Sequence, residues 1–74
     1  MLNKTQKRTL ESELTKEIVL SKGGIDTRIL ANRVVARLST IMPLTIYHAF
    51  GMISWLLKNN NNLILRSPGH SIIA

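Results

Sequence analysis

The sequence predicts a mainly α-helical domain, with three helices followed by a small C-terminal β-hairpin. Apolar residues recur at helical spacing in three separate segments. Glycine, proline and asparagine separate these segments, and residues 63–74 contain two short β-prone runs around a turn. A chain of 74 residues without cysteine fits one domain, residues 1–74, whose stability rests on packing or on a partner chain.

A first helix is predicted over residues Thr5–Lys22. Its apolar face consists of residues that repeat every four positions: Leu10, Leu14 and Ile18. The glycine pair at 23–24 is expected to end this helix, because glycine adopts the left-handed C-cap conformation at little cost. Residues 1–8 are expected to form a flexible basic arm that makes non-specific phosphate contacts through Lys4, Lys7 and Arg8.

A second helix is predicted to begin after Asp26, whose side chain is a good N-cap. Ile25 precedes this cap and is expected to pack on Leu30 as a hydrophobic staple. The apolar positions of this helix again lie four residues apart: Leu30, Val34 and Leu38. Its end is expected between residues 38 and 40, because Pro43 disfavours helical geometry in the residue before it.

A third helix is predicted from Pro43 to about Asn59. Proline suits a first helical turn, and the run of asparagines at 59–62 is typical of a helix end and a loop. Its apolar face is expected to contain Ile46, Ala49, Phe50, Ile53, Leu56 and Leu57. Met52 and Trp55 lie off this face, so either the hairpin covers them or they form a patch for a partner protein or a second copy.

The hairpin is predicted from Leu63–Arg66 and His70–Ile73, joined by the turn Ser67-Pro68-Gly69. Helix, helix, turn, helix and hairpin is an order of elements that resembles winged helix-turn-helix DNA-binding domains. The resemblance covers about half of the chain and rests on three passages: Leu30-Ala31 near the start of the second helix, Leu38–Tyr47 at the turn and the third helix, and Leu56–Leu65 leading into the wing. It implies three helices plus a wing at residues 63–74.

The resemblance also implies a DNA-binding surface. The start of the third helix would enter the major groove with Thr45, Tyr47 and His48. The wing would contact the sugar–phosphate backbone through Arg66 and His70. Phosphate contacts are also expected from Arg28 on the second helix and Lys58 at the end of the third.

The charge distribution favours a polyanionic partner. Lysine and arginine number 10, aspartate and glutamate number 4, and the net charge is +6. No acid follows Asp26, so the apolar part of the chain is purely cationic and is expected to attract nucleic acid or anionic lipid. The uncharged run Ile41–Leu57 is shorter than the roughly 20 residues of a membrane span. Residues 1–16 lack the apolar segment of a secretory signal, and a cytoplasmic location is expected.

Several function classes are disfavoured by what the sequence lacks. Two histidines do not complete a metal site, and no phosphate-loop, dinucleotide or zinc-protease motif is present. We therefore expect no enzyme activity, catalytic residue, metal, cofactor or small-molecule substrate.

The expected function is that of a small transcriptional regulator that binds double-stranded DNA with full or partial sequence specificity. The alternative is a winged-helix interaction module of a phage or another mobile element that binds and modulates a host transcription or nucleoid protein. The first two turns of the third helix contain no arginine or lysine, which favours this alternative. Both functions are compatible with a homodimer. A small membrane protein is the third-ranked interpretation.

Overall fold

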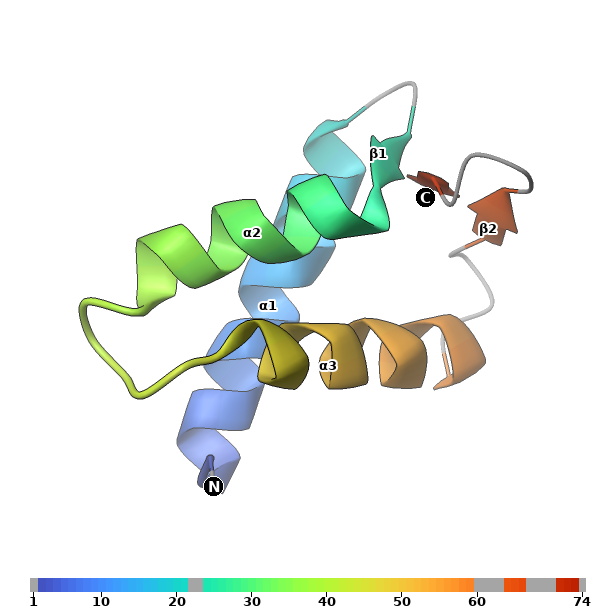
Figure 1. Ribbon diagram of the computed structural model, residues 1–74. Helices are drawn as coiled ribbons and strands as arrows, with labels where there is room; N and C mark the ends of the chain where they lie inside the picture. The colour runs from blue at the N-terminus through green and yellow to red at the C-terminus, as the bar shows by residue number, and fades with distance from the viewer. Residues whose placement is uncertain (1, 22–23, 60–63, 67–70, 74) are drawn as a thin grey trace.

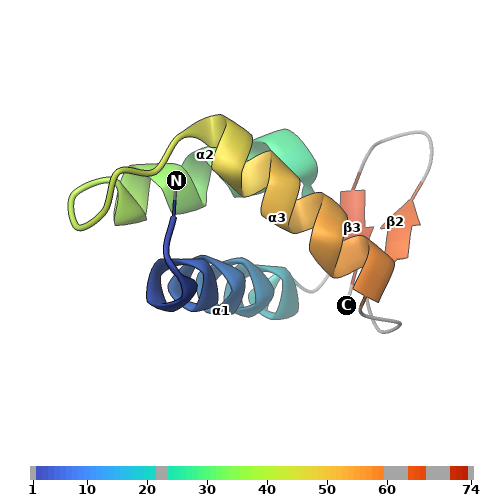
Figure 2. The same ribbon diagram turned by 90° about the horizontal axis from the view of Figure 1, so that it is seen from below.

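Three helices account for most of the computed structural model, which describes residues 2–21 and 24–59, and the backbone of residues 64–66 and 71–73. They are α1 (Lys4–Leu20), α2 (Thr27–Leu38) and α3 (Ile46–Asn59). α2 and α3 run antiparallel beside each other, and α1 packs across both of them (Figures 1 and 2). The predicted mainly helical class with three helices is confirmed.

Three short strands lie at the end of the molecule where α2 begins and α3 ends (Figure 2). They are β1 (Ile25–Asp26), β2 (Ile64–Arg66) and β3 (Ser71–Ile73), arranged antiparallel in the order β1-β3-β2. Residue 72 at the centre pairs with Ile25 on one side and with Leu65 on the other. β1 is absent from the sequence prediction, because a two-residue strand shows no measurable alternation. The turn at residues 67–70 lies outside the described residues.

The basic residues predicted to form a flexible arm belong to the first turns of α1. Asn3 is the N-cap, and its side chain accepts a hydrogen bond from the Gln6 N–H at 2.8 Å. The Gln6 side chain in turn accepts one from the Asn3 N–H at 3.0 Å. This reciprocal capping box fixes the helix start at Lys4, so the expectation of a flexible arm over residues 1–8 is wrong for residues 4–8.

The other end of α1 is closed by a serine. The Ser21 N–H donates to the carbonyl oxygens of Glu17 and Ile18, and its hydroxyl donates to Glu17 O at 2.9 Å. Gly24 has a left-handed φ of 93° and makes the turn into β1, beyond the cap. The helix therefore ends at Leu20, two residues before the predicted end.

The start of α2 matches its prediction, whereas the start of α3 does not. The Asp26 side chain caps α2 by accepting from the N–H groups of residues 28 and 29, and α2 ends at Leu38. Pro43 does not open α3, which begins three residues later at Ile46. The intervening backbone is held by a 2.8 Å hydrogen bond from the Leu44 N–H to Met42 O, and both of these side chains are buried. Because this connection is buried, α3 begins after Thr45, the next residue that can cap a helix.

The hydrophobic core lies where the three helices meet. Its largest fully buried side chains come from α1 and α2: Leu10, Leu14, Ile18, Leu30 and Val34. α3 adds Ala49, Ile53 and Leu56. Ile25 is also buried, which places β1 against the same core. Among the described residues, no helix has both the length and the apolar character needed to cross a membrane.

Candidate nucleic-acid interface

The side of α3 that faces away from the core exposes every aromatic residue of the chain. The sequence contains one tyrosine, one phenylalanine and one tryptophan. Tyr47 is 81% exposed, Trp55 51% and Phe50 36%. The predicted placement of Phe50 on the buried face is wrong, because Phe50 is turned by about 100° from Ala49 and stands at the margin of that face. Aromatic surface is therefore available on α3 for a partner.

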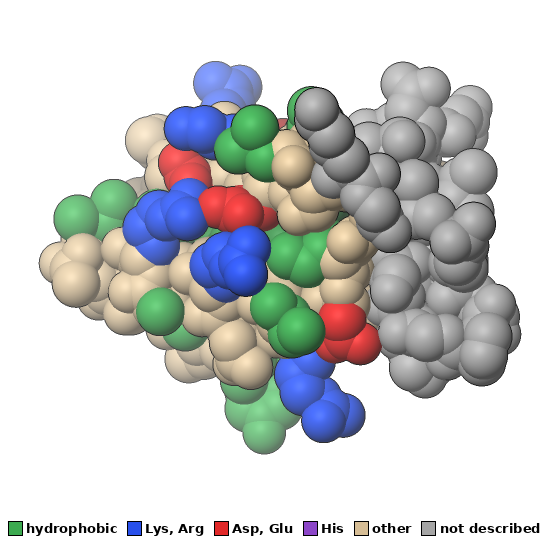
Figure 3. Space-filling model, turned by 90° about the horizontal axis from the view of Figure 1, so that it is seen from above, with side chains coloured by type: hydrophobic (Ala, Val, Ile, Leu, Met, Phe, Trp, Pro, Cys, Tyr) green, Lys and Arg blue, Asp and Glu red, His purple; other side chains and the backbone are tan. Residues whose placement is uncertain are grey.

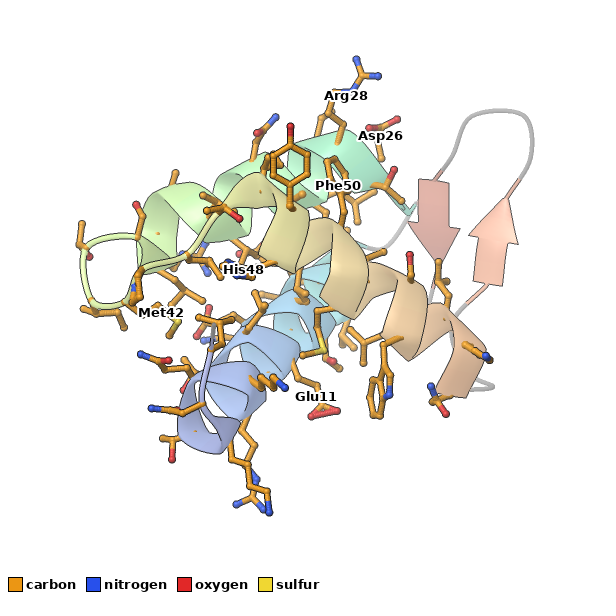
Figure 4. All side chains as sticks on the ribbon, turned by 60° about the horizontal axis from the view of Figure 1, so that its bottom comes forward. Glu11, Asp26, Arg28, Met42, His48 and Phe50 are labelled. Atoms are coloured by element: carbon orange, nitrogen blue, oxygen red, sulfur yellow. The ribbon has the colours of Figure 1, made fainter. Side chains whose placement is uncertain are left out.

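A hollow of about 620 Å³ lies between this side of α3 and the N-terminal half of α1, and we call it the α1–α3 groove. From α3 it is lined by Tyr47, His48, Gly51, Met52 and Trp55. From α1 and the residue before its cap it is lined by Leu2, Lys4, Lys7, Arg8, Leu10 and Glu11. Three cations thus stand along the groove against one carboxylate, Glu11, which lies beside α3 in Figure 4. The groove combines an apolar lining with a basic margin.

A smaller hollow lies on the opposite side of α3. It is lined by Asp26, Thr27 and Arg28 at the start of α2 and by Phe50 of α3. Figure 4 shows Arg28 and Phe50 on the side of α3 away from Glu11. Arg28 is exposed. The exposed side of α3 therefore has three basic side chains and Glu11 of α1 along one margin, and Arg28 of α2 beside Asp26 along the other.

Two of the residues expected to contact bases are joined to each other at the start of α3. The Thr45 N–H donates to His48 Nδ1 at 3.1 Å, and the His48 N–H donates to the Thr45 hydroxyl at 3.4 Å. This is the geometry of a capping box, with histidine in the place of glutamate or glutamine. His48 Nδ1 must be unprotonated to accept this bond, so Nε2 is the ring nitrogen left for a ligand.

The opposite face of the molecule holds an ion-pair network between α1 and α2. Arg37 binds Glu17 at 2.6 Å and Glu13 at 2.9 Å, and Arg33 lies 3.5 Å from Glu17. The hydrogen bond from Arg37 holds the pKa of the Glu17 carboxyl below its usual value, against the effect of burial, and Arg33 acts in the same direction. The same contacts raise the pKa of Arg37. Acidic and basic side chains accordingly stand next to one another in Figure 3.

No known protein family, curated protein sequence or solved structure matches this chain. The assignment of a function therefore rests on the geometry of these surfaces.

The structure brings four of the predicted site residues together in one groove: Tyr47, His48, Met52 and Trp55. Arg28 lies on the other side of α3, and Lys58 is exposed in the last turn of that helix. The backbone of Arg66 is in β2, but its side chain lies outside the described part, and so does the whole of His70. Met52 is half-buried and packs against the core.

Two features of the structure were not predicted from the sequence, one in the site and one on the opposite face. Lys4, Lys7 and Arg8 line the groove from a rigid helix, and the capping pattern at Asn3 and Gln6 could have indicated that helix. The ion-pair network was also missed. Its indication was the matched four-residue spacing of two glutamates on the first helix and two arginines on the second.

Proposed function

We propose that the protein binds double-stranded DNA with α3 in the major groove. The supporting observation is the pair of basic margins on either side of the exposed face of α3. A helix lying in a major groove has a phosphate backbone on each side of it. Side chains of α1 would meet one backbone, and Arg28 at the start of α2 would meet the other.

The distribution of acids supports the same orientation. Every ion pair among the described residues joins Glu13 or Glu17 to Arg33 or Arg37, on the side away from α3. These acids therefore balance cations that would not face the DNA. Glu11 and Asp26 lie beside α3, but the cations there outnumber them, so a net positive charge remains that would attract a polyanion.

The proposal includes a winged-helix fold, which the order of the elements supports. The element order α1-β1-α2-α3-β2-β3 and the central position of β3 agree with three helices and a two-stranded wing. In this arrangement Tyr47 would contact bases and Lys58 would contact phosphate. A domain that selects sequences in this way would act as a small transcriptional regulator.

The test is a titration of a fluorescently labelled, random-sequence duplex, followed by anisotropy at low salt. Arg28→Ala should weaken binding roughly fivefold, because it removes one phosphate contact beside α3. Arg33→Ala is the matched control: it removes the same charge from the opposite face, where Arg37 still holds Glu17. We expect less than a twofold change in this control. Equal losses in the two variants, or no binding by the unchanged protein, would contradict the proposal.

One observation favours a second candidate function, the protein-interaction module. Tyrosine and tryptophan are enriched at the energetic centres of protein interfaces, and here both are exposed on one helix. A transcription or nucleoid protein with an acidic surface would fit the cations around them. This candidate predicts that the protein does not bind duplex DNA at low salt. It also predicts that the protein binds such a partner and that Trp55→Ala abolishes this binding.

A further inference from the structure

We propose that the α1–α3 groove binds single-stranded nucleic acid, with an unstacked base held over Gly51 between the side chains of Tyr47 and Trp55. The phosphates of the strand would lie on the basic side chains of α1. This inference goes beyond duplex binding and does not need α3 to enter a major groove.

The geometry starts from the spacing of three residues on α3. Tyr47, Gly51 and Trp55 stand four positions apart, so each is turned by about 40° around the helix axis from the one before, and Gly51 lies between the two aromatic residues. Each aromatic residue is about 6 Å along the axis from the glycine. All three line the α1–α3 groove. Between the two aromatic side chains the helix surface is therefore bare, and we call this gap the Gly51 slot.

The glycine has no packing reason to be there. Among the residues that the structure describes, none has an atom within 4 Å of a Cβ atom built at Gly51, so none of their elements approaches the helix closely at this point. Glycine inside a helix lowers its stability relative to alanine. Neither a turn nor a close contact with another described residue requires glycine at position 51. The main physical effect of Gly51 is therefore the open space above the helix.

The chemistry around the slot selects a ligand that is both flat and negatively charged. Tyr47 and Trp55 are 81% and 51% exposed, so their ring faces are available for stacking. Lys4, Lys7 and Arg8 outnumber the single carboxylate of Glu11 along the same groove. Aromatic side chains beside a basic groove are the usual means of binding single strands, in which bases stack on rings and cations follow the backbone.

Charge argues against a second copy of this chain as the occupant. The protein has a net charge of +6, and the groove margin is itself basic. Two such surfaces would repel each other. A nucleotide strand supplies the missing negative charge together with the flat faces.

The experiment uses Trp55, the chain's only tryptophan, as an internal probe. A short oligothymidylate is titrated into the protein at low salt, and stacking of a base on Trp55 is expected to quench its fluorescence. Gly51→Leu should weaken the binding about five- to 150-fold, the loss expected for one stacked base. Tyr47→Ala should weaken it to a similar extent while leaving the probe in place.

Stability separates a filled slot from a damaged fold. Gly51→Leu has free space for its Cβ atom and a higher helix propensity, so its thermal midpoint should be equal to or above that of the unchanged protein. Ala36→Leu is the matched control, because it adds a bulky side chain at an exposed position of α2 outside the groove. It should keep the full affinity for the oligothymidylate.

Several outcomes would overturn the inference. It fails if the oligothymidylate does not quench Trp55, or if Gly51→Leu binds as tightly as the unchanged protein. It also fails if thymidine monophosphate binds as tightly as the strand, because the α1 cations would then contact no further phosphates. An oligouridylate titration distinguishes DNA from RNA as the strand. The duplex titration is read separately, so failure of duplex binding leaves this result intact.

Discussion

The hydrogen bonds of His48 stabilise the start of α3, so only part of its side chain remains available to bind a ligand. Its Nδ1 accepts the Thr45 N–H, and its own N–H donates to the Thr45 hydroxyl. Four N–H groups at a helix start have no partner within the helix, and this pair satisfies two polar groups there. Thr45 and His48 were expected to contact bases, but their observed contacts fix where α3 begins. Tyr47, which lies between them, is exposed and has its ring free for a ligand.

The cap predicts a specific effect of substitution at this residue. His48→Ala should lower the free energy of unfolding by about 1 kcal/mol, because it removes the acceptor for the Thr45 N–H. His48→Gln should retain most of that stability, because glutamine at this position completes the usual capping box. Urea denaturation followed by circular dichroism measures both. If the two variants lose the same stability, the hydrogen bonds of His48 do not stabilise α3.

At the scale of elements, α1 and α2 are joined by the buried carboxylate of Glu17. It receives Arg37 at 2.6 Å and Arg33 at 3.5 Å, and Arg37 also reaches Glu13. A carboxylate that is buried on folding needs such partners, because burial alone would favour its neutral form. The lowered pKa of Glu17 shows that the arginines prevail.

This pairing predicts how stability depends on pH. The pKa of Glu17 is lower in the folded state, so its contribution is complete above the unfolded value of about 4.3 and is lost as the pH falls through the folded value. Glu17→Gln should lower the free energy of unfolding by roughly 1 kcal/mol at neutral pH, and the difference should shrink below about pH 4. Urea midpoints measured across this range test it. Glu11→Gln, which removes a carboxylate outside the network, should behave as the unchanged protein; a constant difference for Glu17→Gln would contradict the linkage.

The elements that were predictable from the sequence are those with a repeated pattern. Apolar residues four positions apart located all three helices, and Asp26 located the start of α2. Two helix starts were misplaced for different reasons: the cap at Asn3 was overlooked, and histidine is not a usual member of a capping box. β1 was too short to show alternation.

Features that depend on two elements could not be obtained from either element alone. The arginine partners of Glu17 lie on another helix. The open space above Gly51 likewise depends on where the other described elements pack. Aromatic positions on α3 were visible in the sequence. Their exposure depends on which face the core of α1 and α2 covers, as the misplacement of Phe50 shows.

At the scale of the whole molecule, the structure separates the +6 charge into two regions. On one face, glutamates of α1 bind arginines of α2. Around α3 lie the cations that would meet phosphates: Lys4, Lys7, Arg8, Arg28 and Lys58. These cations outnumber Glu11 and Asp26, which lie beside them, so attraction of a polyanion would act on the side where α3 exposes its aromatic side chains.

This separation predicts the salt dependence of duplex binding. If the five cations around α3 each contact a phosphate, the slope of log affinity against log salt should be about −4 to −5. Replacing Lys4, Lys7 and Arg8 together by glutamine should reduce it to about −2, because three contacts are removed. Lys16→Gln is the control, since Lys16 is exposed on α1 outside both hollows, and its slope should be unchanged. Anisotropy titrations at several salt concentrations give the slopes. A triple variant with the unchanged slope would mean that α1 does not touch the duplex, and α3 would then have to be oriented without contacts from α1.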